Sequence, residues 1–353
     1  ELVAFMPDPD SAFAFITPEE LKTPTVEVPT ALEAIKKAVD KNTLVTYERG
    51  CDINSRDKSG FDAALKAAGD ADAVILVMGG KSGLTPDCTT GEFRDATDLG
   101  LPGMQERLIK TVLKTGKPTV LVLINGRPAS IPKLVKKTNA ILEAWIPGEE
   151  GARAVADVLF GDFNPGGKLP LSIPRSAGQV PVFYNHKPSG MRSNIFGDYF
   201  NEPVKPLFPF GHGLSYSNFV YSRLSIGKKS AKAGDSVDIS LLIKNASKIA
   251  GDEVIQLYVQ DEYASLPRPM KELKGFIRVT LKPGEMKSIV FHLPVNQLAY
   301  YDEDLQLMVE AGKFIIMIGS SSEDIRLRGE FEVKGETRAK IAERVFECPV
   351  EVR

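Results

Sequence analysis

The chain has 353 residues, a length that favours two domains over one. Hydrophobic residues make up 43% of it and charged residues 25%, which is typical of a globular protein. The net charge of −2 gives no positive field for a polyanion, and no apolar run approaches the roughly 18 residues of a membrane span. We therefore expect no nucleic-acid partner and no membrane anchor.

Helices and strands alternate through the first half of the chain. The pattern predicts helices at residues 31–39, 60–70, 103–116 and 149–161, and strands at residues 43–47, 73–79, 118–125 and 140–145. The later strands are apolar on both faces, as strands are in a parallel sheet that helices cover on both sides. Residues 1–185 are therefore predicted to form a doubly wound α/β sandwich domain.

The pattern then changes to Pro- and Gly-rich segments without helix signals. Residues 186–218 are predicted to be an irregular connector that is rich in aromatic side chains. Seven short strands with turn signals follow within residues 219–334, a pattern typical of a fibronectin type III-like β-sandwich. A charged C-terminal tail, residues 335–353, completes the predicted α/β plus all-β architecture.

The most informative segment is the long acidic loop GLTPDCTTGEFRDATDLGLPG, residues 83–103. It follows the carboxyl end of a predicted parallel strand, where open α/β sheets bind ligands. Glu92 is a candidate general acid, because a carboxyl group in a dry cleft has a raised pKa. Arg94 is a candidate to anchor a hydroxyl or to orient a carboxylate. Spacing alone favours a simpler interpretation, a solvated loop in which Asp98 caps the next turn.

Other reactive residue types favour structural roles. The glycines at residues 79–80 follow a strand but lack the GxGxxG pattern of a dinucleotide loop. Cys88 has no neighbouring His to activate it, and the three cysteines of the chain match neither a disulfide framework nor a metal site. His292 and Trp145 lie in strand patterns and are expected to pack. We therefore expect no metal and no cofactor, and reduced thiols are compatible with a cytoplasmic location.

Three stretches are similar to a known family, glycoside hydrolase family 3. They are AILEAWIPGEEGARAVADVLFGDFNPGGKLPLSIPRS, PLFPFGHGLSYSNF and GDEVIQLYVQDEYASLPRPMKELKGFIRVTLKPGE. The resemblance runs over nearly the whole chain. It implies a retaining β-glycosidase with an α/β sandwich domain followed by a fibronectin type III-like domain.

The resemblance also implies roles for residues of the acidic loop. The family takes its acid/base Glu from a pattern Glu-x-x-Asp followed by Leu-x-Leu-Pro-Gly, and here Glu92 and Asp95 precede the stretch at residues 99–103. Glu92 is thus assigned as the acid/base residue, and Arg94 and Asp95 as substrate-binding candidates. Many related sequences have Arg directly after the Asp, where this chain has Ala96.

The chain departs from the family by lacking the nucleophile. In the family this is an Asp, usually in a Ser-Asp-Trp context, in an N-terminal (β/α)8 barrel, whereas Trp145 is the one Trp here and follows Glu143-Ala144. The sequence also opens at Glu1 without Met, which suggests a fragment or processed chain. The barrel is therefore expected on another segment or chain, and the fragment alone is expected to be inactive.

The expected partners are this barrel and an oligosaccharide or aryl β-glycoside. An exo-acting enzyme would remove β-D-xylosyl or β-D-glucosyl residues from the non-reducing end, and a homo-oligomer is compatible with the sequence. The alternative is a non-catalytic carbohydrate-binding or scaffold fragment. A nucleotide-binding protein would need a phosphate loop at a strand–helix junction, and the sequence contains none.

Overall fold

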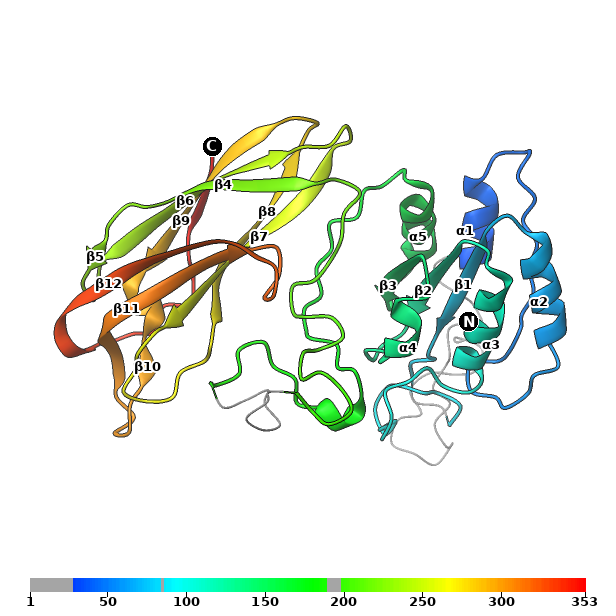
Figure 1. Cartoon of the computed structure of the whole chain (residues 1–353), viewed down its shortest axis with the longest axis horizontal. Helices are drawn as coiled ribbons and strands as arrows, with labels where there is room; N and C mark the ends of the chain where they lie inside the picture. The colour runs from blue at the N-terminus through cyan, green and yellow to red at the C-terminus, as the bar shows by residue number, and fades with distance from the viewer. Residues whose placement is uncertain (1–27, 84–85, 189–197) are drawn as a thin grey trace, which may run out of the picture. The chain divides into compact units, whose positions relative to one another are not determined.

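The computed structural model describes residues 28–83, 86–188 and 198–353. These residues form two compact units. Unit 1 extends to Phe163 and includes Arg175–Val180, and unit 2 comprises Asn164–Pro174 and Pro181–Arg353. Figure 1 shows a small helix-covered sheet in unit 1 and two layers of strands in unit 2.

Unit 1 is built on a parallel sheet with the order β1-β2-β3. Its strands are β1 (Val74–Gly79), β2 (Thr119–Ile124) and β3 (Ala140–Trp145). The central strand is the most deeply buried, and Leu121 and Val122 on its two faces are fully enclosed. Because the strands are parallel, their carboxyl ends lie at one edge, and the loop after β1 is a neighbour of the turn after β2.

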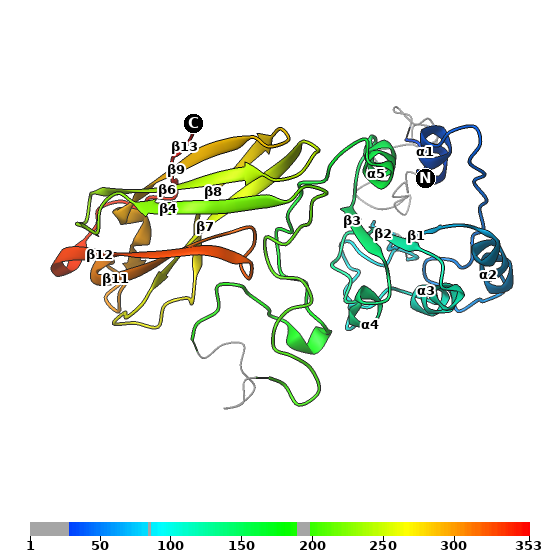
Figure 2. The same ribbon diagram turned by 45° about the horizontal axis from the view of Figure 1, so that its top comes forward.

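Helices cover both faces of this sheet. They are α1 (Ala31–Ala38), α2 (Phe61–Asp70), α3 (Gln105–Val112), α4 (Pro132–Val135) and α5 (Gly151–Phe160), with 3-10 turns at Leu113–Thr115 and Ala177–Gln179. Figure 2 shows α1 and α5 on one face and α3 and α4 on the other. Local signals set the ends of the helices: Thr30 and Glu33 form a capping box at the start of α1, and Gly161 ends α5 with a φ of 87°. The predicted arrangement of helices on both faces is confirmed.

The strand predicted at residues 43–47 is wrong. No strand is assigned there, and among the described residues β1 pairs with β2 alone. Leu44 is 86% exposed and Tyr47 is 61% exposed. The segment has the composition of a strand, but a strand forms only when a neighbour pairs with its backbone N–H and C=O groups. No described strand does so.

Unit 2 is a β-sandwich of two sheets. One sheet has the order β5-β12-β11-β7-β8, with β10 beside β11, and the other has the order β13-β9-β6-β4. The strands are β4 (Phe219–Ile226), β5 (Ser230–Ala231), β6 (Ser236–Asn245), β7 (Gly251–Asp261), β8 (Glu272–Leu281), β9 (Met286–Pro294), β10 (Tyr300–Tyr301), β11 (Leu307–Gly319), β12 (Ile325–Lys340) and β13 (Val350–Val352). A 3-10 turn, Val295–Leu298, follows β9.

Alternating side chains fill the space between the two sheets. In β6, Val237, Ile239, Leu241 and Ile243 are each 1% exposed or less, while the residues between them face outward. The seven predicted strands are confirmed as β4, β6, β7, β8, β9, β11 and β12. The short strand β13 pairs with β9, so the end of the chain is part of the sandwich.

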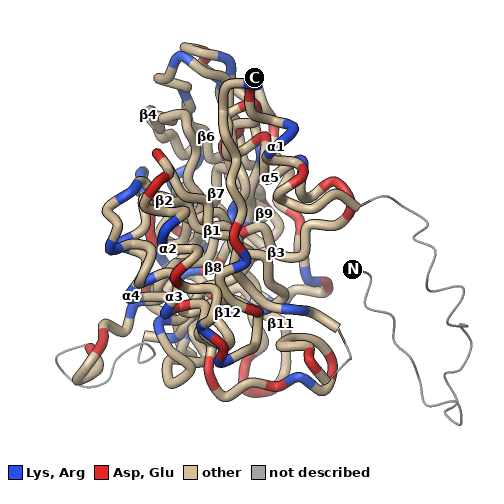
Figure 3. Tube along the Cα trace, turned by 90° about the vertical axis from the view of Figure 1, so that its right-hand side faces the viewer, with Lys and Arg blue, Asp and Glu red and all other residues tan. Residues whose placement is uncertain are grey.

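Acidic and basic residues are interspersed along the described chain (Figure 3). His292 on β9 pairs with residues of two neighbouring strands: its Nδ1 lies 2.7 Å from Asp238 on β6, and its Nε2 lies 3.3 Å from Glu351 on β13. These carboxylates, Asp238 first, raise the pKa of His292. In the part of the chain that the structure describes, no helix has the length and apolar character to cross a membrane.

Candidate active site

The candidate site begins where β1 ends. Gly79 has a φ of 148°, and a Cβ on it would lie 1.8 Å from Ile124 O, so the position requires glycine. The side chain of Gln105 reaches the same point: its Oε1 accepts the Gly79 N–H at 2.8 Å and its Nε2 donates to Gly79 O at 2.7 Å. Gln105 is 2% exposed. It fixes where the loop leaves the sheet, a role that no sequence motif marks.

The first part of the loop folds back on itself. Thr89 N and Thr90 N donate to Lys81 O at 2.8 and 3.2 Å, and Gly83 N donates to Thr90 O at 3.0 Å. The hydroxyls of Ser82 and Thr90 are also hydrogen-bonded to each other. These bonds hold residues 81–83 and residues 89–90 together next to the carboxyl end of β1.

The turn between β2 and α4, residues 125–130, holds this loop from the side, and we name it the clamp turn. Its Arg127 donates from Nη1 to Thr89 O at 3.0 Å and from Nη2 to Arg94 O. One guanidinium therefore binds the backbone on both sides of the segment that contains Glu92. A planar, permanently charged group with several fixed donors is suited to such a double contact.

The predicted site residues, Glu92, Arg94 and Asp95, lie within or next to the segment that Arg127 holds. The side chain of Glu92 is exposed, and so is that of Asp95. Arg94 is half-buried, and its Nη1 donates to Phe93 O at 2.9 Å. Phe93 has a φ of 59° and is 82% exposed, so a bulky residue holds a strained left-handed conformation next to Glu92. The roles assigned to Glu92, Arg94 and Asp95 stay predictions.

The end of the loop is fixed by its own turn. Gly100 N donates to Asp98 Oδ1 at 2.9 Å, which is the capping role that the simpler interpretation gave to Asp98. Ser130, at the end of the clamp turn, donates its N–H to Leu99 O at 2.7 Å. The capping at Asp98 and an active role for Glu92 are compatible, because the two residues lie on different parts of the loop.

A second carboxyl group, which the sequence pattern did not indicate as a candidate, lies near the same edge of the sheet. Glu143 on β3 accepts hydrogen bonds at Oε1 from Asn125 Nδ2 at 2.7 Å and from the Trp145 N–H at 3.1 Å. Burial raises the pKa of Glu143 to about 7, and the two hydrogen bonds oppose that shift. A single Glu in an apolar strand gives no signal of such a setting, because its partners are Asn125 in the clamp turn and the backbone of Trp145 at an irregularity of β3.

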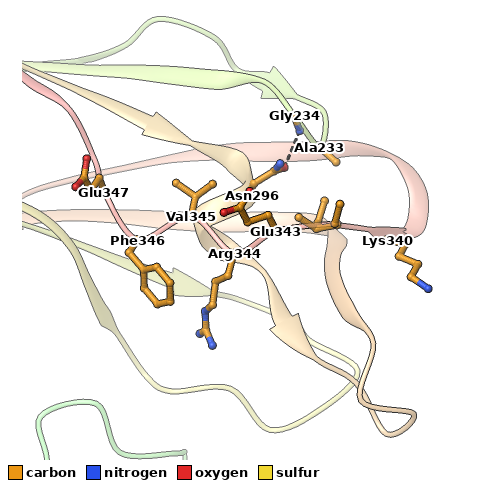
Figure 4. A pocket seen from close by; sticks show the side chains of 11 residues that line it. Ala233, Gly234, Asn296, Lys340, Glu343, Arg344, Val345, Phe346 and Glu347 are labelled. Atoms are coloured by element: carbon orange, nitrogen blue, oxygen red, sulfur yellow. Dashed lines mark hydrogen bonds between the residues drawn. The ribbon is translucent and has the colours of Figure 1, made fainter.

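Unit 2 contains a separate hollow of about 800 Å³ that is lined by the C-terminal segment, residues 340–347 (Figure 4). Figure 4 shows Val345 and Asn296 directed to one side of the segment and Arg344 and Phe346 to the other. Phe346 is 77% exposed, so the segment crosses the surface with one half-buried side and one open side. The hollow contains no residue of the acidic loop.

Metal and thiol chemistry find no support in the described residues. No group of three or more His, Cys, Asp or Glu side chains there is arranged to hold a metal ion. Cys88 is only 5% exposed, and burial raises the pKa of Cys348 to about 12.

Comparison with known proteins gives the family. Residues 13–216 match the glycosyl hydrolase family 3 C-terminal domain, and residues 253–322 match a fibronectin type III-like domain. The chain belongs to glycosyl hydrolase family 3. The predicted fold class, an α/β domain followed by a fibronectin type III-like β-sandwich, is confirmed.

Individual relatives match much of this chain and less than half of their own length. A beta-xylosidase of Formosa agariphila is 45% identical over 291 residues, which are 82% of this chain and 39% of that protein. A periplasmic beta-glucosidase of Salmonella typhimurium is 40% identical over 297 residues, 82% of this chain and 38% of that protein. The crystal structure of a beta-glucosidase from Listeria innocua in complex with glucose has a TM-score of 0.74 and 37% identity, covering 81% of this chain and 40% of that one.

Proposed function

We propose that this chain is the C-terminal part of a retaining, exo-acting β-glycosidase, in which Glu92 is the acid/base residue. The observation that carries the proposal is the setting of Glu92: an exposed carboxyl group on a strained segment that Arg127 holds from both sides. Family membership supports it. The proposed nucleophile is an Asp of an N-terminal (β/α)8 barrel, outside the 353 residues considered.

The chemistry requires two carboxyl groups that act in turn. The nucleophile attacks the anomeric carbon while protonated Glu92 gives its proton to the leaving oxygen, and a covalent glycosyl–enzyme forms. The Glu92 carboxylate then takes a proton from water, which attacks the anomeric carbon and releases the sugar. An exposed Glu92 fits this scheme, because the surface that closes its pocket from water would come from the barrel.

The fixed backbone around Glu92 supports the proposal further. Acid/base catalysis needs the carboxyl group within hydrogen-bond reach of the glycosidic oxygen, so the loop must keep a defined position. Arg94 and Asp95 follow Glu92 closely in the same loop and are proposed as contacts to sugar hydroxyls. The substrate class that we propose is an oligosaccharide or aryl glycoside with a terminal β-D-xylosyl or β-D-glucosyl residue, since the relatives described above are named for both activities.

The test is the substitution Glu92→Gln in the complete enzyme that contains this chain. We expect turnover of an unactivated β-glycoside to fall by about 10²–10⁴-fold, because the leaving oxygen no longer receives a proton. An aryl substrate with a good leaving group should lose much less in the first step, and azide should restore turnover by replacing activated water. Glu48→Gln, at another exposed Glu of unit 1, serves as the matched control. Full activity of Glu92→Gln would refute the assignment.

A second candidate function is a non-catalytic carbohydrate-binding or scaffold fragment. It is supported by the exposed side chains of Glu92 and Asp95, polar groups that a sugar could contact without any reaction. The chain alone and the chain combined with the barrel should be assayed on the same aryl β-xyloside and β-glucoside. Activity only in the combination supports the first function, whereas sugar binding by the chain alone without activity in either sample supports the second.

A further inference from the structure

Glu92 lies in a four-residue turn with an unusual third residue. The turn runs from Gly91 to Arg94, and the Arg94 N–H donates to Gly91 O at 3.2 Å. Phe93 is its third residue and has a φ of 59°, a left-handed value of the kind that type II turns require at this position. Glycine and asparagine are favoured there, because a bulky side chain is strained in this conformation. The turn that presents Glu92 is therefore strained.

Packing of the Phe93 side chain does not offset this strain. The ring is 82% exposed, so it gains little from burial. A strained residue persists only where the surrounding structure fixes the backbone next to it. The start of the turn is already closely packed, since a Cβ on Gly91 would lie 2.3 Å from Gly83 O. The end of the turn needs a contact of its own.

Arg127 of the clamp turn makes that contact and a second one before the turn. Its Nη2 donates to Arg94 O, directly after Phe93, and its Nη1 donates to Thr89 O at 3.0 Å, two residues before Gly91. Hydrogen bonds from a charged donor are stronger than those between neutral groups. The rigid fork of one guanidinium also sets the distance between the two carbonyl oxygens, which a single ammonium group cannot do.

The clamp turn is itself fixed at both ends. The Asn125 N–H donates to Trp145 O on β3 at 3.0 Å, and the Ser130 N–H donates to Leu99 O at 2.7 Å. In between, a Cβ on Gly126 would lie 2.6 Å from Ser82 Oγ, so the turn has little room to shift. Arg127 therefore extends from a turn whose position the sheet determines.

We propose that Arg127 is a positioning residue: its guanidinium holds the strained turn, and with it the Glu92 carboxyl group, in one place at the carboxyl edge of the sheet. The inference rests on the proposed function, because the position of the turn matters for catalysis only if Glu92 is the acid/base residue. In this role Arg127 acts through the loop backbone and contacts neither the substrate nor the Glu92 side chain.

Hydrogen–deuterium exchange of the 353-residue chain tests the hold on the turn. The Arg94 amide closes the turn, so Arg127→Ala should lower its protection about tenfold or more, the effect of losing hydrogen bonds to a charged group. The Gly80 amide, which donates to Ile124 O at 3.0 Å, should keep its protection. The matched control is Arg153→Ala, at an arginine on α5 that pairs with Glu150, and it should change neither amide.

Chemical rescue separates a local hold from general destabilisation. Guanidinium at a millimolar, non-denaturing concentration should restore protection of the Arg94 amide in Arg127→Ala, because it offers the same donors to the two carbonyl oxygens. Methylammonium should not, because its donors do not form a planar fork. Arg127→Lys keeps the charge without the fork and should retain only part of the protection. This variant also serves if Arg127→Ala does not fold.

The kinetic test uses the complete enzyme that contains this chain. Arg127→Ala should lower kcat about 10²-fold, the order of loss when a reacting group is misplaced, with little change in KM, and guanidinium should restore part of it. The proposal is overturned if the Arg94 amide stays fully protected in Arg127→Ala, or if KM rises while kcat is unchanged, which would indicate a substrate contact. The exchange measurements involve no substrate, so a failure of this hold is distinct from a failure of the Glu92 assignment, which Glu92→Gln tests.

Discussion

Replacing Gln105 tests whether α3 fixes the start of the acidic loop. The substitution Gln105→Leu keeps the volume and the helix propensity of the side chain and removes its polar groups. It leaves three backbone groups without their partner: the Gly79 N–H, Gly79 O and Ile53 O, which Gln105 now binds at 2.8, 2.7 and 3.0 Å.

The expected cost follows from the burial of this amide. A buried donor or acceptor that loses its partner costs about 1–3 kcal/mol, and a carbonyl with a second lone pair costs less than an N–H group. Gln105 is 2% exposed, so water cannot replace it without rearrangement. We expect Gln105→Leu to lower the free energy of unfolding of unit 1 by about 2–4 kcal/mol.

Urea denaturation followed by Trp145 fluorescence measures this free energy, because the one Trp of the chain lies in unit 1. The matched control is Glu106→Gln at the next residue, whose carboxylate pairs with Lys110 on the helix surface. Such a pair is worth about 0.2–0.5 kcal/mol, so the control should shift the midpoint little. A loss below about 1 kcal/mol in Gln105→Leu would refute the reasoning, because an unsatisfied buried donor costs at least that much.

Two more predictions concern a glycine and a histidine. Gly79→Ala should destabilise unit 1 by about 3 kcal/mol or more, since its Cβ would lie 1.8 Å from Ile124 O. The control is Gly116→Ala, at a glycine that also has a positive φ but has nothing within 4 Å of its Cβ position. It should cost about 1 kcal/mol in the same urea assay. The carboxylates beside His292 raise its pKa, so the attachment of β13 should be strongest below the ordinary His pKa and weaken as the pH rises through the raised value. Amide exchange of Val350–Val352 measures this, and a pH dependence that persists in His292→Gln would contradict it.

Local sequence patterns predicted most of the elements because each carries its own signal. The buried strand β2 is apolar on both faces, and the strands of unit 2 alternate between inward and outward side chains. The strand predicted at residues 43–47 was wrong for a physical reason. The composition of residues 43–47 suits a strand, but a strand also needs a pairing partner from elsewhere in the chain. No described strand provides that partner.

The candidate site was only partly predictable. Its place after β1 was predicted from the rule that parallel sheets bind ligands at their carboxyl ends, and the role proposed for Glu92 came from the resemblance to a family motif. The residues that hold the loop carried no such signal. Gln105, Arg127 and Glu143 look like ordinary polar residues in the sequence, since most of their partners are backbone atoms or side chains 18 to 52 positions away.

The sequence by itself determined the order of the elements, the two kinds of domain and the acidic loop as the candidate site. These depend on periodicity, turn residues and a contiguous motif, which act over a few residues. Only the tertiary structure decided that Arg127 binds the loop on both sides of Glu92, and that Glu143 is buried enough to have a pKa of about 7. Hydrogen bonding and desolvation depend on which distant segments pack together, and that is settled only when the chain folds.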